Sequence, residues 1–143
     1  MIDSRTAPYA ALLLRVALGT MFIAHALLKY YVFTLPGTAQ FFQSLGLPGA
    51  LAYATFWAEL AGGIAILAGL FSRWASLALL PVLLGAAWAH AGNGWVFSAP
   101  NGGWEYPVFL AFAAAVQVLL GDGRFAAVSL LPARKLQPIL SSN

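Results

Sequence analysis

The stretch PYAALLLRVALGTMFIAHALLKYY, residues 8–31, decides the fold of this chain. Crossing the hydrocarbon core of a bilayer as a helix takes about 20 mostly apolar residues, and this stretch supplies them. It also carries Arg15, His25 and Lys29, whose charged forms are costly in hydrocarbon. The stretch therefore predicts a membrane helix that needs polar partners on neighbouring helices.

The composition of the whole chain points to the same class of protein. Hydrophobic residues make up 62% of the 143 residues and charged residues only 8%, which is too little charge for a soluble domain of this size. Lys and Arg outnumber Asp and Glu by 7 to 4, but they are scattered along the chain, which argues against a nucleic-acid partner. Because the chain has no Cys, disulfides and thiolate ligands from this chain are excluded.

Four apolar runs organise the sequence. They cover residues 8–31, 48–71, 74–91 and 106–121, and a tail follows at 122–143. Trp and Tyr residues flank the two shorter runs, as expected at the interface between lipid and water. The sequence therefore predicts an all-α integral membrane four-helix bundle that forms a single domain over residues 1–143 and has the lipid bilayer as its first partner. Residues 38–45 predict a short amphipathic helix in the first loop.

The basic residues predict the orientation of the bundle. Arg5 precedes the first run, Arg73 lies between the second and third, and Arg124, Arg134 and Lys135 follow the fourth. Cytoplasmic loops of membrane proteins carry an excess of Lys and Arg. We therefore expect both termini to be cytoplasmic, and the loops at 32–47 and 92–104 to face outward.

One face of the first predicted helix is polar, because Arg15, His25 and Lys29 project within a narrow arc at 100° per residue. Glu59, in the second run, should lie at a depth between Arg15 and His25, so either side chain could reach its carboxylate. Two interpretations of an Arg15 to Glu59 pair stay open. It could pin two helices together, or it could form part of a functional charged pocket.

A group of ionisable residues is expected near the outer end of the bundle, where His25, Lys29, His90 and Glu105 should share one leaflet. Three chemistries compete for this group. Metal ligation has no short ligand motif in its favour, and haem held between His25 and His90 is disfavoured by the neighbouring Lys29. A pocket for the head group of a quinone-like molecule, covered by Trp or Tyr, explains the most residues.

The same residues carry a resemblance to a known family. The matching motifs are Arg15 with Gly19, Phe22, His25 and Lys29, then Glu59 with Gly62 and Gly63, Gly69 and Leu70 before Arg73, Asn93 with Gly94, and GGWEYP at 102–107. From about residue 9 to 125 the chain resembles the DoxX family of small bacterial inner-membrane proteins. It departs from the family pattern at Ala26, where relatives often have Gly, and at Leu131, where many have Asp.

The resemblance implies a four-helix bundle in the bacterial inner (plasma) membrane that acts as the membrane component of an oxidoreductase. Relatives are linked to thiosulfate:quinone oxidoreduction, to quinone resistance or to complexes with soluble redox enzymes. We therefore expect a quinone to bind at a cluster in which Glu59 and His25 exchange protons. The residues of the expected cluster are Arg15, His25, Lys29, Glu59, His90, Trp104, Glu105 and Tyr106.

A second function stays open at this point. The chain could instead be a non-catalytic membrane scaffold or small-molecule carrier, whose charged core sets helix register and whose tail recruits soluble partners. Ridges of Ala and Gly on the predicted helices also allow a homo-oligomer.

Overall fold

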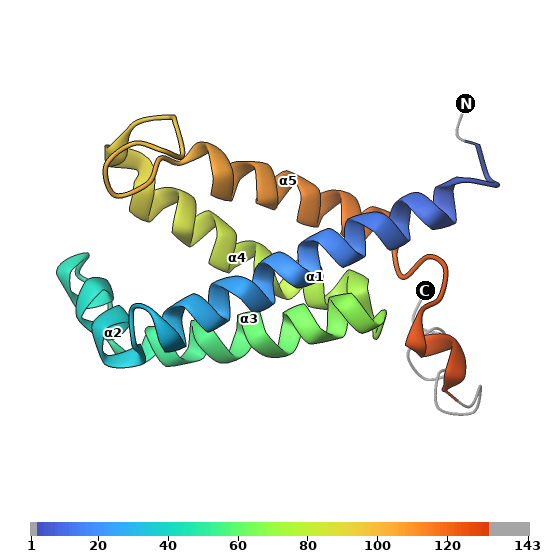
Figure 1. Ribbon diagram of the computed structural model, residues 1–143, viewed down its shortest axis with the longest axis horizontal. Helices are drawn as coiled ribbons and strands as arrows, with labels where there is room; N and C mark the ends of the chain where they lie inside the picture. The colour runs from blue at the N-terminus through green and yellow to red at the C-terminus, as the bar shows by residue number, and fades with distance from the viewer. Residues whose placement is uncertain (1–2, 132–143) are drawn as a thin grey trace.

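The computed structural model describes residues 3–131, which form helices joined by turns and loops (Figure 1). Within this range no strand occurs, so the prediction of an all-helical bundle is confirmed. The bundle helices are α1 (Ala7–Tyr31), α3 (Ala50–Ala68), α4 (Ser72–His90) and α5 (Glu105–Leu120), and the shorter elements are α2 (Leu35–Ser44), η1 (Ala91–Asn93) and η2 (Ala127–Leu130). α1 packs mainly against α3, and α4 mainly against α5.

The bundle has two distinct ends (Figure 1). At the loop end lie α2 and residues 91–104, which connect α4 to α5. At the tail end lie the beginning of α1, the turn at 69–71 and the segment 121–131. Both ends of the described chain are therefore at the tail end, an arrangement compatible with the expected cytoplasmic location of both termini, which stays a prediction.

Three helices are long and apolar enough to cross a membrane: α1, α3 and the continuous helical segment Ser72–Asn93. The fourth apolar helix, α5, has 16 residues. At 1.5 Å per residue it extends about 24 Å, whereas the hydrocarbon core measures about 30 Å. Three of the four predicted spans thus have full spanning length, and the fourth is shorter.

Glycine allows α1 and α3 to approach closely. A Cβ added to Gly19 would lie 2.7 Å from the Leu67 backbone nitrogen and 2.9 Å from the Gly63 carbonyl oxygen. A Cβ added to Gly63 would lie 3.0 Å from Ile23 and Phe22. In lipid, helices associate through such close packing, because burial of apolar side chains from water gives little driving force there. This crossing brings Glu59, one turn before Gly63, against the second half of α1.

The apolar core fills the space between the bundle helices. Its buried residues are Leu18, Phe22, Ile66, Leu79, Leu83, Leu110, Ala111 and Ala114. A Cβ on Gly62 would lie 2.7 Å from Leu79, so this second glycine of α3 admits a bulky side chain from α4. The core separates the polar groups of the loop end from those of the tail end.

The segment 121–131 is fastened across the tail end by backbone hydrogen bonds. The Arg124 N–H donates to the Pro8 carbonyl at 3.0 Å, and the Val128 N–H donates to the Gly69 carbonyl at 3.0 Å. Gly69 ends α3 with a positive φ of 73°, which suits a residue without Cβ. The remainder of the predicted tail, with Arg134 and Lys135, lies outside the described residues.

Candidate functional site

An ion pair between a largely buried lysine and a buried glutamate joins α1 to α3. The Lys29 Nζ donates to the Glu59 Oε2 at 2.6 Å, and the two side chains are 16% and 8% exposed. A buried charge is tolerated only when it is paired and hydrogen-bonded, because transfer from water costs several kcal/mol per ion. Lys29 is therefore the partner that keeps Glu59 inside the bundle.

The predicted pairing of Glu59 with Arg15 is wrong. Side chains on a helix tilt toward its N-terminus. On α1 this turns Arg15 toward the tail end, whereas Glu59 on the antiparallel α3 turns toward the loop end. Lys29 tilts back toward the middle of α1, and its ammonium group meets the Glu59 carboxylate.

Arg15 instead holds the tail segment. Its guanidinium donates from Nη1 to the Asp122 carbonyl at 2.6 Å and from Nη2 to the Phe125 carbonyl at 3.1 Å, and the residue is 2% exposed. The Asp122 carboxylate accepts from the Ser72 N–H at 2.7 Å, at the N-terminus of α4, where the helix dipole favours an anion. Arg15 therefore belongs to the tail end and is not part of a site with Glu59.

His25 lies between the ion pair and α5. Its Nδ1 lies 2.8 Å from the Met21 carbonyl, which can only accept, so Nδ1 carries a proton. In the neutral ring Nε2 then keeps its lone pair. The ring stacks on Tyr106 with centroids 5.7 Å apart and planes at 24°, and it lies within coulombic range of Glu59. His25 thus lies near the Glu59 carboxylate, and its role in proton exchange stays a prediction.

His90 orders the loop end. Its Nδ1 lies 3.1 Å from the Asn101 carbonyl, and the Asn93 amide donates to the carbonyls of Asn101 and Gly102 at 3.1 and 2.9 Å. These contacts close the loop at 94–104 onto the end of α4. The structure gives His90 a role in loop geometry rather than a place beside Lys29 and Glu59.

Glu105 and Trp104 begin α5 and shape the same loop. The Glu105 Oε1 accepts from the Phe97 N–H at 2.7 Å, and the Glu105 N–H donates to the Trp95 carbonyl at 3.1 Å. The Trp104 ring meets the Trp95 ring edge to face, with centroids 4.4 Å apart. Both residues therefore hold the segment 95–97 against the first turn of α5.

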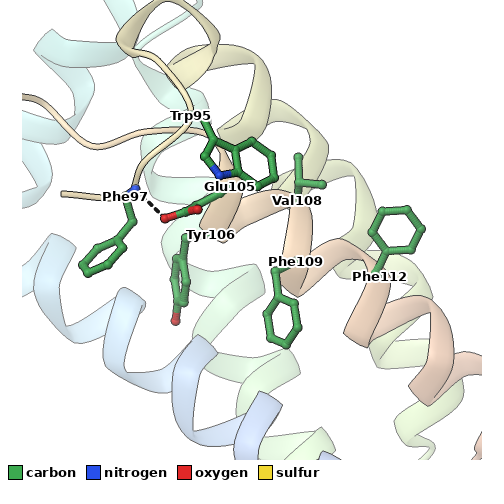
Figure 2. A pocket seen from close by; sticks show the side chains of 7 residues that line it. All are labelled: Trp95, Phe97, Glu105, Tyr106, Val108, Phe109 and Phe112. Atoms are coloured by element: carbon green, nitrogen blue, oxygen red, sulfur yellow. Dashed lines mark hydrogen bonds between the residues drawn. The ribbon is translucent and has the colours of Figure 1, made fainter. Parts of the chain in front are cut away.

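A hollow of about 440 Å³ opens beside this turn (Figure 2). Its lining consists of Trp95, Phe97, Glu105, Tyr106, Val108, Phe109 and Phe112. Figure 2 shows Tyr106 pointing from α5 toward α1, away from Trp95, while Phe109 and Phe112 follow along α5. Phe109 and Phe112 are 69% and 71% exposed, so the hollow opens onto the apolar surface of the bundle.

Tyr106 connects the hollow to the buried polar residues. It lines the hollow, and its ring also stacks on His25. Its hydroxyl is buried and has no hydrogen-bond partner among residues 3–131. His25, Lys29, Glu59 and Tyr106 therefore lie together, whereas His90, Trp104 and Glu105 order the loop and Arg15 lies at the far end.

Three residues have roles that the sequence did not predict, two at the hollow and one at the tail end. Trp95 and Phe97 line the hollow, although their sequence positions suggest only a membrane belt of aromatic residues. Asp122 joins α1 to α4 through its carbonyl and carboxylate, although its position just after α5 suggests only a tail. The tilt of helical side chains could have identified Lys29 as the partner of Glu59.

Comparison with known proteins places this geometry in a family. The profile of the DoxX family matches residues 10–92, which is more than half of the chain. The chain belongs to the DoxX family. The matched range contains the Lys29 to Glu59 pair and His25, and it ends before α5 and the aromatic hollow. The long apolar helices and the family together make this DoxX protein a membrane protein.

A curated relative carries a redox name. The protein called "Putative oxidoreductase CatD", from Bacillus subtilis (strain 168), is 41% identical over 75 residues. The match covers 52% of this chain and 54% of the relative, so the chain spans about half the length of that protein. No solved structure matches the chain.

Proposed function

We propose that this DoxX protein is the membrane component of a quinone-linked redox system in the bacterial inner membrane, and that the aromatic hollow holds the ring of a quinone-like molecule. The observation that carries the proposal is the position of Tyr106, which lines the hollow and stacks on His25 beside the Lys29 to Glu59 pair. The family and the redox name of the relative support the same class of function.

The shape and lining of the hollow suit such a ligand. Ligand pockets are mostly apolar, with a few polar groups that fix orientation. Trp95, Phe97 and Tyr106 offer flat rings for stacking. The exposed rings of Phe109 and Phe112 border the hollow on the apolar surface, the side from which a lipid-soluble molecule arrives. A hollow of about 440 Å³ has room for a substituted ring, with its apolar tail left in the lipid.

Side chains that can form hydrogen bonds or take up protons lie on the side of the hollow that faces α1. The Tyr106 hydroxyl is buried on the side of α1 and has no hydrogen-bond partner within residues 3–131, so in this proposal a ring carbonyl inserts past the Tyr106 ring to accept its hydrogen bond. His25 and Glu59 can each take up a proton, His25 at the Nε2 lone pair of its neutral ring and Glu59 at its carboxylate, and each can pass that proton on toward the bound ring. Conversion of a quinone to a quinol takes up two electrons and two protons. In this proposal a soluble redox enzyme supplies the electrons, and this chain binds the ring and exchanges protons.

A binding titration tests the proposal. Decylubiquinone is titrated into the purified protein in lipid nanodiscs, and quenching of Trp fluorescence is followed. Tyr106→Phe removes only the hydroxyl, and we expect about a tenfold weaker affinity, the loss of one hydrogen bond. Glu59→Gln should also change binding, whereas Tyr9→Phe, the same change at the tail end, should not. Binding that fails to saturate, or that is the same in all variants, would contradict the proposal.

One observation favours the second function, a scaffold that recruits soluble partners. Arg15, buried inside the bundle, donates two hydrogen bonds to the backbone carbonyls of Asp122 and Phe125, which fixes the segment from which residues 132–143 continue. Truncation after Leu131 keeps every described contact and removes 132–143. If the truncated protein loses a soluble partner in co-purification but still binds decylubiquinone, the tail serves recruitment and the hollow serves the ligand.

A further inference from the structure

Glu105 is the lining residue of the aromatic hollow whose side chain carries a carboxylate. It lies there with Trp95, Phe97 and Tyr106. Its Oε1 accepts from the Phe97 N–H at 2.7 Å, and Figure 2 shows this bond beside the lining rings. Within residues 3–131 the second oxygen, Oε2, has neither a hydrogen-bond donor nor a cation as its partner. The Oε2 atom is therefore an acceptor that the hollow can offer to a ligand.

The loop holds this carboxylate in place. The Glu105 N–H donates to the Trp95 carbonyl at 3.1 Å, while its Oε1 accepts from Phe97. Backbone and side chain of Glu105 are thus both bonded to the segment 95–97, and the carboxylate cannot turn away without breaking a bond to the loop. A group that is already oriented in this way loses less conformational freedom when a ligand binds.

The other polar groups at the hollow can act as donors. The Trp95 indole N–H can only donate, and the Tyr106 hydroxyl, which lies on the side of α1, can donate or accept. The oxygen of a quinone carbonyl and the oxygen of a quinol hydroxyl can each accept a hydrogen bond from such a group. Donors therefore hold the oxidised and the reduced ring alike.

A carboxylate distinguishes the two forms of the ring. The hydroxyl groups of a quinol donate to a carboxylate oxygen, whereas the carbonyl oxygens of a quinone can only accept. A quinone oxygen at the Glu105 Oε2 would meet a second acceptor with no proton between the two. Hydrogen bonds to an ionised acceptor are among the stronger ones, so this difference favours the quinol.

We propose that Glu105 makes the hollow selective for the reduced ring, because its Oε2 accepts a hydrogen bond from a quinol hydroxyl. This preference rests on the proposed function, since it concerns the same hollow and the same class of ligand. Conversion of a quinone to a quinol takes up two electrons and two protons, and tighter binding of the quinol raises the reduction potential of the bound couple. The hollow therefore favours reduction of a bound quinone.

A competition experiment tests the preference. Trp fluorescence of the protein in lipid nanodiscs is quenched with decylubiquinone, and decylubiquinol is then added as a competitor under anaerobic conditions. Empty nanodiscs correct for partition into the lipid. We expect the quinol to bind about tenfold more tightly than the quinone, the effect of one hydrogen bond to a charged group. Equal affinities in the unmodified protein, or tighter binding of the quinone, would overturn the proposal.

Glu105→Gln tests the role of the carboxylate. The Gln carbonyl oxygen can still accept from the Phe97 N–H, while its amide NH₂ puts a donor in the place of Oε2. The roughly tenfold preference should then disappear, because donors hold both forms. Asp3→Asn is the matched control and should keep the preference, since the Asp3 Oδ1 accepts from the Arg5 N–H at 2.8 Å at the tail end. A preference that survives in Glu105→Gln would contradict the proposal.

A redox titration tests the preference without any variant. The midpoint potential of decylubiquinone is measured with the protein in nanodiscs and with empty nanodiscs. Tenfold tighter binding of the quinol should raise the potential of the bound couple by about 30 mV, the value for a couple of two electrons. An equal or lower potential would contradict the proposal, even if Glu105→Gln cannot be purified in a folded form.

Failure of the preference and failure of the proposed function give different results. If neither form of decylubiquinone binds in a saturable way, the proposed function is wrong and the preference falls with it. If both forms bind in a saturable way with equal affinity, the proposed function stands and only the preference is wrong. Tyr106→Phe should weaken both forms by a similar factor, because the hydroxyl can donate to either kind of oxygen.

Discussion

At the residue scale, the Lys29 to Glu59 pair is the most demanding feature of the molecule. Glu59 is buried and Lys29 is largely buried in a bundle of apolar helices, and each is held there by the other. A buried ion pair is not strong evidence of stabilisation, since apolar residues of similar volume often replace one without loss. We therefore attribute the Lys29 to Glu59 pair to the proposed ligand site rather than to stability. Its contribution to the free energy of unfolding can be tested.

Removal of either Lys29 or Glu59 alone should lower the free energy of unfolding much more than removal of both. Glu59→Gln leaves the Lys29 ammonium buried without a counter-charge, which should lower the free energy of unfolding by about 3–5 kcal/mol. Lys29→Met combined with Glu59→Leu should recover most of this loss. Thermal unfolding of the purified protein, followed by circular dichroism, measures both. A double variant no more stable than Glu59→Gln would contradict the view that the unpaired charge is what costs.

Sequence reasoning found the polar residues but not all their partners. The insertion cost of charged groups identified Arg15, Lys29 and Glu59 as residues in need of partners. Axial depth then left both Arg15 and His25 as partners of Glu59 and passed over Lys29, because depth ignores the direction in which side chains tilt. The true partners of Arg15 are backbone carbonyls of Asp122 and Phe125, which composition and spacing do not reveal.

At the element scale, glycines decide how closely helices approach. Gly19→Ala places a Cβ against Leu67 and the Gly63 carbonyl, so α1 and α3 must separate. We expect a loss of about 1–3 kcal/mol in unfolding free energy, the usual cost of overpacking. Gly85→Ala is the matched control, because nothing lies within 4 Å of its added Cβ and Ala is the better helix former. Equal thermal stability of the two variants would show that the close crossing is not needed.

The conformation of the loop at 94–104 depends on Gly103. A Cβ on Gly103 would collide with the carbonyl oxygens of Val96 and Trp95, and Trp95 and Phe97 of the same segment line the hollow. Gly103→Ala should therefore open the loop and speed amide hydrogen exchange in the peptide 94–105. Gly92→Ala, with free space around its Cβ, should leave exchange unchanged. Protection that survives in Gly103→Ala would mean that the loop wall is not built on this contact.

The helices were easier to predict than the loop. Apolar run length located α1, α3 and α4 to within a few residues, since a stretch of about 20 apolar residues has one solution in lipid. The loop at 94–104 could not be predicted in the same way. Its shape depends on Asn93, His90 and Glu105 meeting backbone groups across turns, and residue spacing does not encode such contacts.

At the scale of the whole molecule, the orientation in the membrane is open to direct test. The chain has no Cys, so single cysteines can be introduced without background. We expect Ser98→Cys, at the loop end, to react with a membrane-impermeant maleimide in intact cells, and Ser4→Cys to react only after cell lysis. The reverse pattern would contradict the predicted cytoplasmic termini.

The apolar core lies between two groups of polar residues, one at the loop end and one at the tail end, and we propose that they have different roles. The loop end carries the hollow and the groups that we propose to bind and protonate a quinone, and the tail end carries Arg15 and its grip on the tail. A substitution that weakens ligand binding at the loop end should leave the contacts of Arg15 with the tail segment intact, and the reverse should also hold. This separation distinguishes the account from one in which all ionisable groups form a single cluster.

The most direct test of the central claim is to map where a quinone binds. A photoreactive benzoquinone analogue is irradiated with the protein in lipid nanodiscs, and labelled peptides are identified by mass spectrometry. The account predicts label within residues 95–112, competed by excess decylubiquinone and reduced by Tyr106→Phe. Label spread over the exposed apolar residues of all the bundle helices, with no competition, would contradict it.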